Sequence, residues 1–143
     1  MVRFPRTAMN DVPVIEFLRD RELSSGLDYQ SVITTLCHEV ALAHFPQYAE
    51  ALVESALQRE SYEPTFVGRG LSVPHARVPG LTSAVVYHAH CSEGIDWAGQ
   101  MAHYVVLLAV PEEQPELYLR LLSQVIRQHT RSVHRSGDSV SFL

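Results

Sequence analysis

Apolar residues recur at helical spacing in three separate stretches of the chain. The first follows Asp28, a residue type favoured at helix N-caps, and predicts a helix over residues 29–45. The second opens with a proline, which suits a first helical turn, and predicts a helix over residues 46–60. The third stretch predicts a helix over residues 115–128, beyond which the sequence turns polar. Each helix has one apolar face, so each needs another element to pack against.

Other stretches predict strands and a long loop. Residues 83–91 indicate a strand, Gly94 indicates a turn, and the continuous apolar run over residues 104–110 is typical of a strand buried on both faces. Residues 14–18 fit either a short strand or a helical turn. Residues 61–80 hold three glycines and three prolines and indicate a loop. Two helices, then strands, then a helix predict a mixed α/β sandwich.

Length and composition favour one folded domain. The chain has 143 residues, of which 46% are hydrophobic and 19% charged, and this balance excludes disorder as the main state. We find no internal repeat and no low-complexity tract. The expected organisation is an N-terminal arm over residues 1–13, a domain over residues 14–128 and an atypical tail over residues 129–143.

Charge and cysteine content narrow the expected partners and the expected location. The net charge of −5 argues against non-specific nucleic-acid binding, which usually depends on a basic patch. No apolar run approaches the ~20 residues that span a bilayer, and no signal peptide is visible, so we expect a cytoplasmic protein without membrane insertion. Cys37 and Cys91 form no CxxC pattern, and two reduced, buried thiols are the simplest interpretation.

The candidate chemistry is concentrated at the end of the second predicted helix and in the loop after it. Pro74 restricts the backbone beside His75, whose imidazole has an ordinary pKa of ~6.5 and is a nucleophile when neutral. Arg59 and Arg77 are nearby cations, and the guanidinium fork matches phosphate oxygens. This pattern indicates a histidine that handles phosphate, with a merely structural or exposed histidine as the competing interpretation.

A set of short motifs in this region resembles a known family. The motifs are Arg59-Glu60, Pro64-Thr65, Gly68 and Leu71-Ser72-Val73-Pro74-His75-Ala76. Their order and spacing resemble the active-site region of the fructose/mannitol-type IIA domains of the bacterial sugar phosphotransferase system, a family that includes nitrogen-regulatory IIA proteins. The likeness covers roughly residues 14–128. It implies a mixed β-sheet sandwiched between helices.

The resemblance also implies a function, that of a phosphocarrier with a phosphohistidine, acting as a IIA component of the phosphotransferase system. Such a domain accepts a phosphoryl group from HPr or a paralogue and passes it to a IIB domain, for sugar uptake or for nitrogen or metabolic regulation. Carried onto this chain, His75 is the phosphorylated residue and Arg59 stabilises the phosphoryl charge. No metal or other cofactor is implied. The implied neighbours of the phosphoryl group are Thr65, Ala76, Arg77 and Tyr118.

Three departures from the family pattern keep an alternative open. Tyr118 stands where the family typically has a second histidine, and Ala76 stands where it usually has glycine. Family members also usually carry one more helix where this chain has residues 129–143. The alternative is a diverged, non-phosphorylated binding module that regulates a transporter or enzyme by contact. The same fold without the active histidine occurs in cytoplasmic regulatory domains of anion exchangers.

A pair of histidines outside this region allows other interpretations. His88 and His90 lie on one face of the predicted strand, with His103 as the nearest further imidazole, but a structural zinc site needs four ligands. One of the pair is alternatively a second imidazole beside His75. Arg69, together with Arg77, is a candidate contact for an acidic rim on a partner protein.

Overall fold

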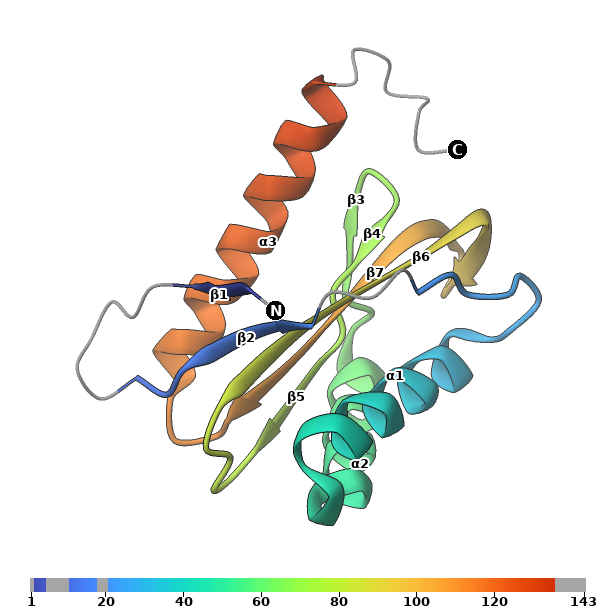
Figure 1. Ribbon diagram of the computed structural model, residues 1–143. Coiled ribbons are helices and arrows are strands. Elements are labelled where there is room, and N and C mark those ends of the chain that lie inside the picture. Colours follow the sequence, from blue (N-terminus) through green and yellow to red (C-terminus); the bar gives the residue numbers. More distant parts are fainter. Residues whose placement is uncertain (1, 5–10, 18–20, 136–143) are drawn as a thin grey trace.

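Figure 1 shows the computed structural model, which describes residues 2–4, 11–17 and 21–135. Within these residues a mixed seven-stranded sheet has the order β1-β2-β6-β7-β4-β3, and β5 also pairs with β7. Helices cover both faces, as the resemblance implies. The strands are β1 (Val2–Phe4), β2 (Val14–Phe17), β3 (Phe66–Gly68), β4 (Leu71–Ser72), β5 (His75–Val78), β6 (Ala84–Trp97) and β7 (Gln100–Pro111).

The antiparallel pair β6 and β7 forms the centre of the sheet. Residues 84–87 of β6 and 104–111 of β7 are continuously apolar, as expected where helices cover both faces of a sheet. β2 runs parallel to β6, and both β4 and β5 run parallel to β7. Of residues 14–18, which fitted a strand or a helical turn, residues 14–17 form the strand β2, and residue 18 lies outside the described residues.

Two helices, α1 (Tyr29–His44) and α2 (Ala49–Tyr62), form the layer on one face of the sheet (Figure 1). The Asp28 side chain caps α1 by accepting a hydrogen bond from the Ser31 amide at 2.7 Å, as the sequence predicts. A short 3₁₀ turn, Pro46–Tyr48, joins the helices. The apolar faces of both helices pack on β6 and β7 to form the larger core.

The third helix, α3 (Pro115–Arg135), lies on the opposite face (Figure 1). Its buried side chains Leu117, Leu121 and Val125 form a second core with residues of β2, β4, β6 and β7. The helix extends past residue 128, where the sequence indicated a polar tail. The expected domain boundary at 128 therefore falls inside α3, and residues 136–143 lie outside the described residues. No helix among the described residues is long and apolar enough to cross a membrane.

The turn predicted at Gly94 is wrong. Gly94 lies inside β6, where the register with β7 shifts between His90 and Ile95, and its φ is +90°. A Cβ there would lie 2.4 Å from Sδ of Met101, so glycine permits a close approach of two strands rather than a reversal. The chain reverses after Trp97, between β6 and β7.

The loop predicted over residues 61–80 contains three short strands, β3, β4 and β5. Each has two to four residues, too few to show a period in sequence, and each depends on pairing, β4 and β5 directly with β7. The expectation for the cysteines is confirmed in that Cys37 and Cys91 are both buried, free thiols. Burial raises the pKa of Cys37 to about 12.

Candidate functional site

His75 is the first residue of β5 and is held rigidly by strand pairing. It lies opposite Leu108 in the parallel pair with β7, and the Leu108 amide donates to the Pro74 carbonyl at 3.0 Å. On the preceding side, the Val73 amide donates to the Thr65 carbonyl at 3.0 Å. Only 4% of His75 is exposed. The backbone on both sides of the imidazole is therefore fixed before any ligand arrives.

One nitrogen of this ring is committed to the backbone. Nδ1 of His75 lies 3.3 Å from the Val73 carbonyl oxygen, and a carbonyl only accepts, so Nδ1 carries the hydrogen. Burial lowers the pKa of His75 to about 4; the hydrogen bond to Val73 opposes this shift, and the charges of Arg59 and Arg77 add to it. At neutral pH the ring is uncharged, and its lone pair is on Nε2.

Arginine and tyrosine side chains share a cavity of about 500 Å³ with His75. The Tyr118 ring lies against the imidazole, with centroids 4.4 Å apart and planes inclined by 38°. Cζ of Arg77 lies 5.9 Å from the Tyr118 ring centroid, within the range of a cation–π contact. Nη1 of Arg59 donates to the Glu63 carbonyl at 2.8 Å. Two cations and a phenol thus surround one neutral imidazole.

Hydrogen bonds from α2 hold the strand that carries Arg77. The Arg77 amide donates to Oγ of Ser55 at 2.8 Å, and the same hydroxyl donates to the Arg77 carbonyl at 3.1 Å. This pair of bonds ties β5 to the helix that carries Arg59. The backbone segments that carry the two arginines are therefore fixed relative to each other, whereas the Arg77 side chain is exposed.

A buried carboxylate holds the segment between α2 and β3. Glu60 is 4% exposed and accepts hydrogen bonds from three donors, the Thr65 amide at 2.6 Å, Oγ1 of Thr65 at 2.9 Å and Nε1 of Trp97 at 2.9 Å. A buried carboxylate is stable in such a setting because its oxygens are satisfied. This network, which we call the Glu60 clamp, connects the residue after Arg59 to the end of β6.

The structure brings four of the six predicted site residues together, namely Arg59, His75, Arg77 and Tyr118. The other two do not line the cavity. Thr65 belongs to the Glu60 clamp, and Ala76 is fully buried in the larger core, because successive residues of a strand face opposite sides. Ala76 is also absent from the described non-glycine residues with positive φ, so alanine causes no backbone strain there.

The sequence reasoning missed four residues that line this cavity. Three of them are on α2 and share the helix face of Arg59, which spacings of three and four residues could have revealed. The fourth follows β7 and brings a carboxylate to the site, which only the sheet topology places there. These residues are Ser55, Gln58, Tyr62 and Glu112.

The other histidines lie elsewhere. His88 and His90 line a second cavity, beside α3, and the ring in contact with His75 is that of Tyr118. Among the described residues, no group of three or more histidine, cysteine or acidic side chains is placed to hold a metal ion. Arg69 does not line the His75 cavity; its carbonyl oxygen accepts a hydrogen bond from His129 at 2.9 Å.

Comparisons with known proteins assign the chain to one family. Residues 22–131 match the family described as "Phosphoenolpyruvate-dependent sugar phosphotransferase system, EIIA 2". The chain belongs to this EIIA family, which confirms the resemblance read from the Arg-Glu and Pro-His motifs.

Individual relatives agree with this assignment. The chain is 35% identical over 107 residues to the PTS system 2-O-alpha-mannosyl-D-glycerate-specific EIIABC component of Escherichia coli, covering 66% of this chain and 16% of that protein. It is 33% identical over 84 residues to a nitrogen regulatory protein of Bradyrhizobium diazoefficiens, covering 57% and 55%. The chain therefore spans about half or less of the length of these relatives.

The fold is also that of a solved relative. The nitrogen regulatory protein IIA-Ntr from Neisseria meningitidis superposes with a TM-score of 0.66 at 20% identity, covering 86% of this chain and 82% of that one. The predicted fold class, a mixed sheet between helices, is thereby confirmed.

Proposed function

We propose that this chain is a phosphocarrier that accepts a phosphoryl group on Nε2 of His75 from an HPr-like carrier protein. The observation that carries the proposal is the state of His75: a buried, uncharged imidazole whose Nδ1–H is held by Val73 and whose neighbours are two arginines. A neutral ring is nucleophilic, and the arginines match the charge of a phosphoryl group.

The transfer step balances without a proton leaving His75. The Nε2 lone pair forms the new P–N bond while the bond from phosphorus to the carrier's histidine breaks and its electron pair returns to that ring. The Nδ1 hydrogen stays with His75, where the Val73 carbonyl stabilises the positive charge that the ring gains. Arg59 and Arg77 stabilise the phosphoryl oxygens, since this chemistry depends mainly on positioning and charge.

The relatives support two destinations for the phosphoryl group. Similarity to an EIIABC component supports a IIB domain as the next acceptor, in sugar uptake. Similarity to a nitrogen regulatory protein supports a role in which the phosphorylation state itself is the signal.

The proposal is tested by reconstituted phosphorylation. The protein is incubated with phosphoenolpyruvate, the first enzyme of the phosphotransferase system and HPr or its nitrogen-branch paralogue, and its intact mass is measured. We expect an acid-labile gain of one phosphoryl mass in the wild type and none in His75→Gln. A wild type that stays unmodified with both carriers, under conditions that label a known relative, contradicts the proposal.

A second candidate function is a non-phosphorylated module that regulates a transporter or enzyme by contact. The observation that favours it is the Tyr118 ring, which packs on His75 where the family typically has an imidazole. A phenol donates one hydrogen bond but does not become a cation there. If the folded protein is not phosphorylated in the reconstituted reaction, this second function is the one that the site supports.

A further inference from the structure

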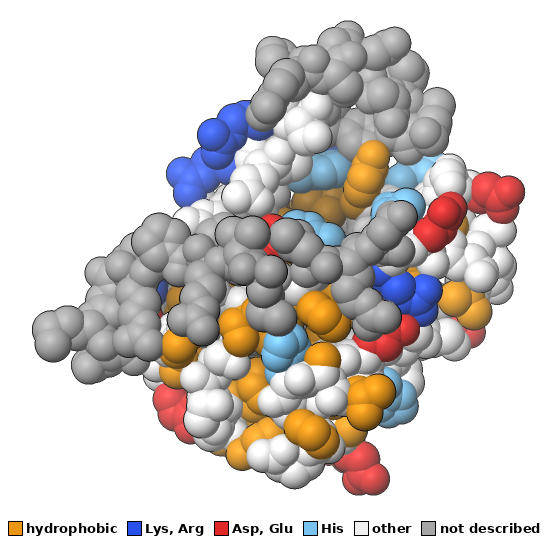
Figure 2. Space-filling view, in the orientation of Figure 1, with side chains coloured by type: hydrophobic (Ala, Val, Ile, Leu, Met, Phe, Trp, Pro, Cys, Tyr) orange, Lys and Arg blue, Asp and Glu red, His pale blue; other side chains and the backbone are white. Residues whose placement is uncertain are grey.

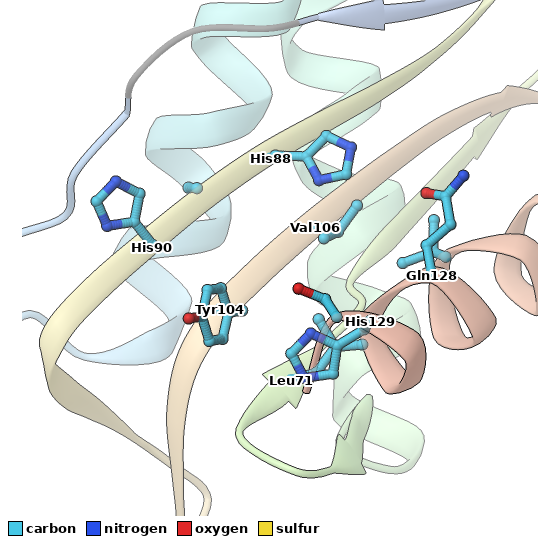
Figure 3. Close-up of a pocket in the computed structure, with 10 residues that line it drawn as sticks. Leu71, His88, His90, Tyr104, Val106, Gln128 and His129 are labelled. Atoms are coloured by element: carbon cyan, nitrogen blue, oxygen red, sulfur yellow. The ribbon is translucent and has the colours of Figure 1, made fainter. Parts of the chain in front are cut away.

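A second cavity, of about 350 Å³, lies between α3 and the sheet. Figure 2 shows histidine side chains beside hydrophobic ones on this face, and Figure 3 shows that the residues around the cavity come from β4, β6, β7 and α3. None of its lining residues is shared with the His75 cavity. Of its lining residues only Leu71 belongs to the family motifs named above, and both members of the His88-x-His90 pair line it.

The walls of this cavity are mainly apolar and aromatic. Leu71, Val106 and Val125, from three different elements, belong to the core that α3 forms with the sheet. Beside them, the rings of Tyr104 and His129 meet edge to face, with centroids 5.1 Å apart and planes inclined by 64°. Such walls favour a flat ring, because aromatic partners gain from stacked and edge-to-face contacts.

Two polar side chains on opposite walls of the cavity can orient a bound ligand by hydrogen bonding. Nε2 of His88 lies 2.9 Å from a carboxylate oxygen of Glu16, so in the neutral ring Nε2 donates and Nδ1 carries the lone pair. The Gln128 amide, which offers both a donor and an acceptor, is on the opposite wall, on α3. His88 is thus an oriented acceptor and Gln128 an adaptable partner.

The charge of the lining selects against ionic ligands. Among the described residues that line this cavity there is no lysine, arginine, aspartate or glutamate. The His75 cavity, by contrast, contains two arginines. Its ionisable side chains are Tyr104 and the histidines His88, His90 and His129, and the Glu16 carboxylate lies 2.9 Å from His88. A ligand with a permanent charge that enters between α3 and the sheet loses water and finds no lysine, arginine, aspartate or glutamate in the described lining to offset that cost.

We propose that this cavity binds a small, uncharged aromatic or heteroaromatic molecule, with a ring N–H or O–H that donates to His88. The volume equals that of about twelve water molecules at ~30 Å³ each and lies at the lower end of small-molecule sites, ~300–1,000 Å³. A single or fused ring system of indole or nucleobase size fits this space. The inference goes beyond the phosphocarrier function and does not depend on it.

The test is a ¹H–¹⁵N NMR titration of the full chain with indole and with adenine, beside benzoate as an anionic ring of similar size. We expect indole or adenine to shift the amides of Leu71, Val106 and Val125 with a Kd of about 1 mM or tighter. Benzoate should bind at least tenfold more weakly. No shifts at these residues up to about 5 mM of either neutral probe would overturn the proposal, as would equal binding of benzoate.

Substitutions in the lining test whether the probes bind inside this cavity. Val106→Phe fills the floor and should weaken binding at least tenfold, and Gln128→Trp narrows the exposed rim, which keeps the test decisive if the core substitution fails to fold. His38→Phe, an exposed histidine on α1, is the matched control and should bind as the wild type does. Unchanged affinity in both cavity variants would overturn the proposal. No phosphoryl donor is present, so these results are independent of His75 chemistry.

Discussion

The two cavities of this protein use the same side chain in different surroundings. In each, one ring nitrogen of a histidine is tied to a fixed acceptor, the Val73 carbonyl for His75 and the Glu16 carboxylate for His88. The His75 cavity adds Arg59, Arg77 and Glu112, whereas no lysine, arginine, aspartate or glutamate lines the cavity beside α3 within the described residues. A histidine that lines a cavity therefore does not by itself define the chemistry. In the two proposals above, the charges around the imidazole distinguish an anion site from a site for an uncharged ring.

The largest effect is expected on stability, from removing the Glu60 clamp. The clamp holds the segment that leads to the His75 cavity and has no residue in the lining of the cavity beside α3. Glu60→Ala leaves the buried donors of Thr65 and Trp97 without their acceptor, at ~1–3 kcal/mol for each unsatisfied group, so the free energy of unfolding should fall by about 3–5 kcal/mol. Urea unfolding measures this free energy. Glu54→Ala, exposed on the same helix, is the control. A Glu60→Ala protein as stable as this control would show that the clamp is not structural.

The acid dependence of stability should be the next largest effect. Below pH ~6.5 the unfolded chain binds a proton at His75, and the folded protein, with a pKa of about 4, does not. Stability is thus fully present above pH 6.5 and is lost as the pH falls toward 4, by about 3 kcal/mol. Urea unfolding between pH 4 and 7 should show this extra loss in the wild type and not in His75→Asn. If the stability of the two proteins falls equally with pH, His75 is not the source of the loss.

Removal of the arginine charge should slow phosphorylation by about 10- to 150-fold. Charge-assisted hydrogen bonds are worth ~1.5–3 kcal/mol, and Arg59→Gln removes such bonds to the phosphoryl oxygens. Arg77→Gln should act in the same direction and less strongly, because its side chain is exposed. The initial rate of phosphoryl uptake is the measurement, with the exposed Arg127→Gln on α3 as control. Equal rates in Arg59→Gln and Arg127→Gln would remove Arg59 from the site.

Substitutions of Tyr118 should give the smallest change, of a few-fold. Tyr118→His restores an imidazole that can become a cation beside the phosphoryl group and should raise the rate. Tyr118→Phe should lower it by about two- to tenfold if the hydroxyl donates to a phosphoryl oxygen, since such a bond is worth ~0.5–1.5 kcal/mol. The rates of both variants are compared with that of the wild type. If all three are the same, Tyr118 is only packing.

The helices, the main strands and the grouping of Arg59, His75, Arg77 and Tyr118 could be anticipated from the sequence. The helices and main strands were visible because long amphipathic helices and long apolar strands carry local periodic signals. Arg59 and His75 belong to the family motifs, and Arg77 is two residues after His75. Tyr118 was identified by the family alignment. The contact between His75 and Tyr118 joins positions 43 residues apart, and no local pattern encodes it.

The rest of the structure depends on pairing across the fold. Strands β4 and β5 are too short to have a period and exist because β7 accepts them as neighbours. The role of Thr65 was misplaced for the same reason, since its partner Glu60 is shared with Trp97, 37 positions along the chain. Gly94 looked like a turn because the sequence does not show that Met101 approaches it from the next strand.

The most direct test of the central claim is the identity of the phosphorylated atom. The protein is labelled with ¹⁵N in its histidine rings, phosphorylated by an HPr-like carrier and observed by ¹⁵N and ³¹P NMR. Because Nδ1 of His75 is held by the Val73 carbonyl, we predict one new P–N bond, seen as a ³¹P coupling on Nε2 of His75 alone. A coupling on Nδ1, a coupling on another histidine, or none under conditions that label a relative would contradict the account.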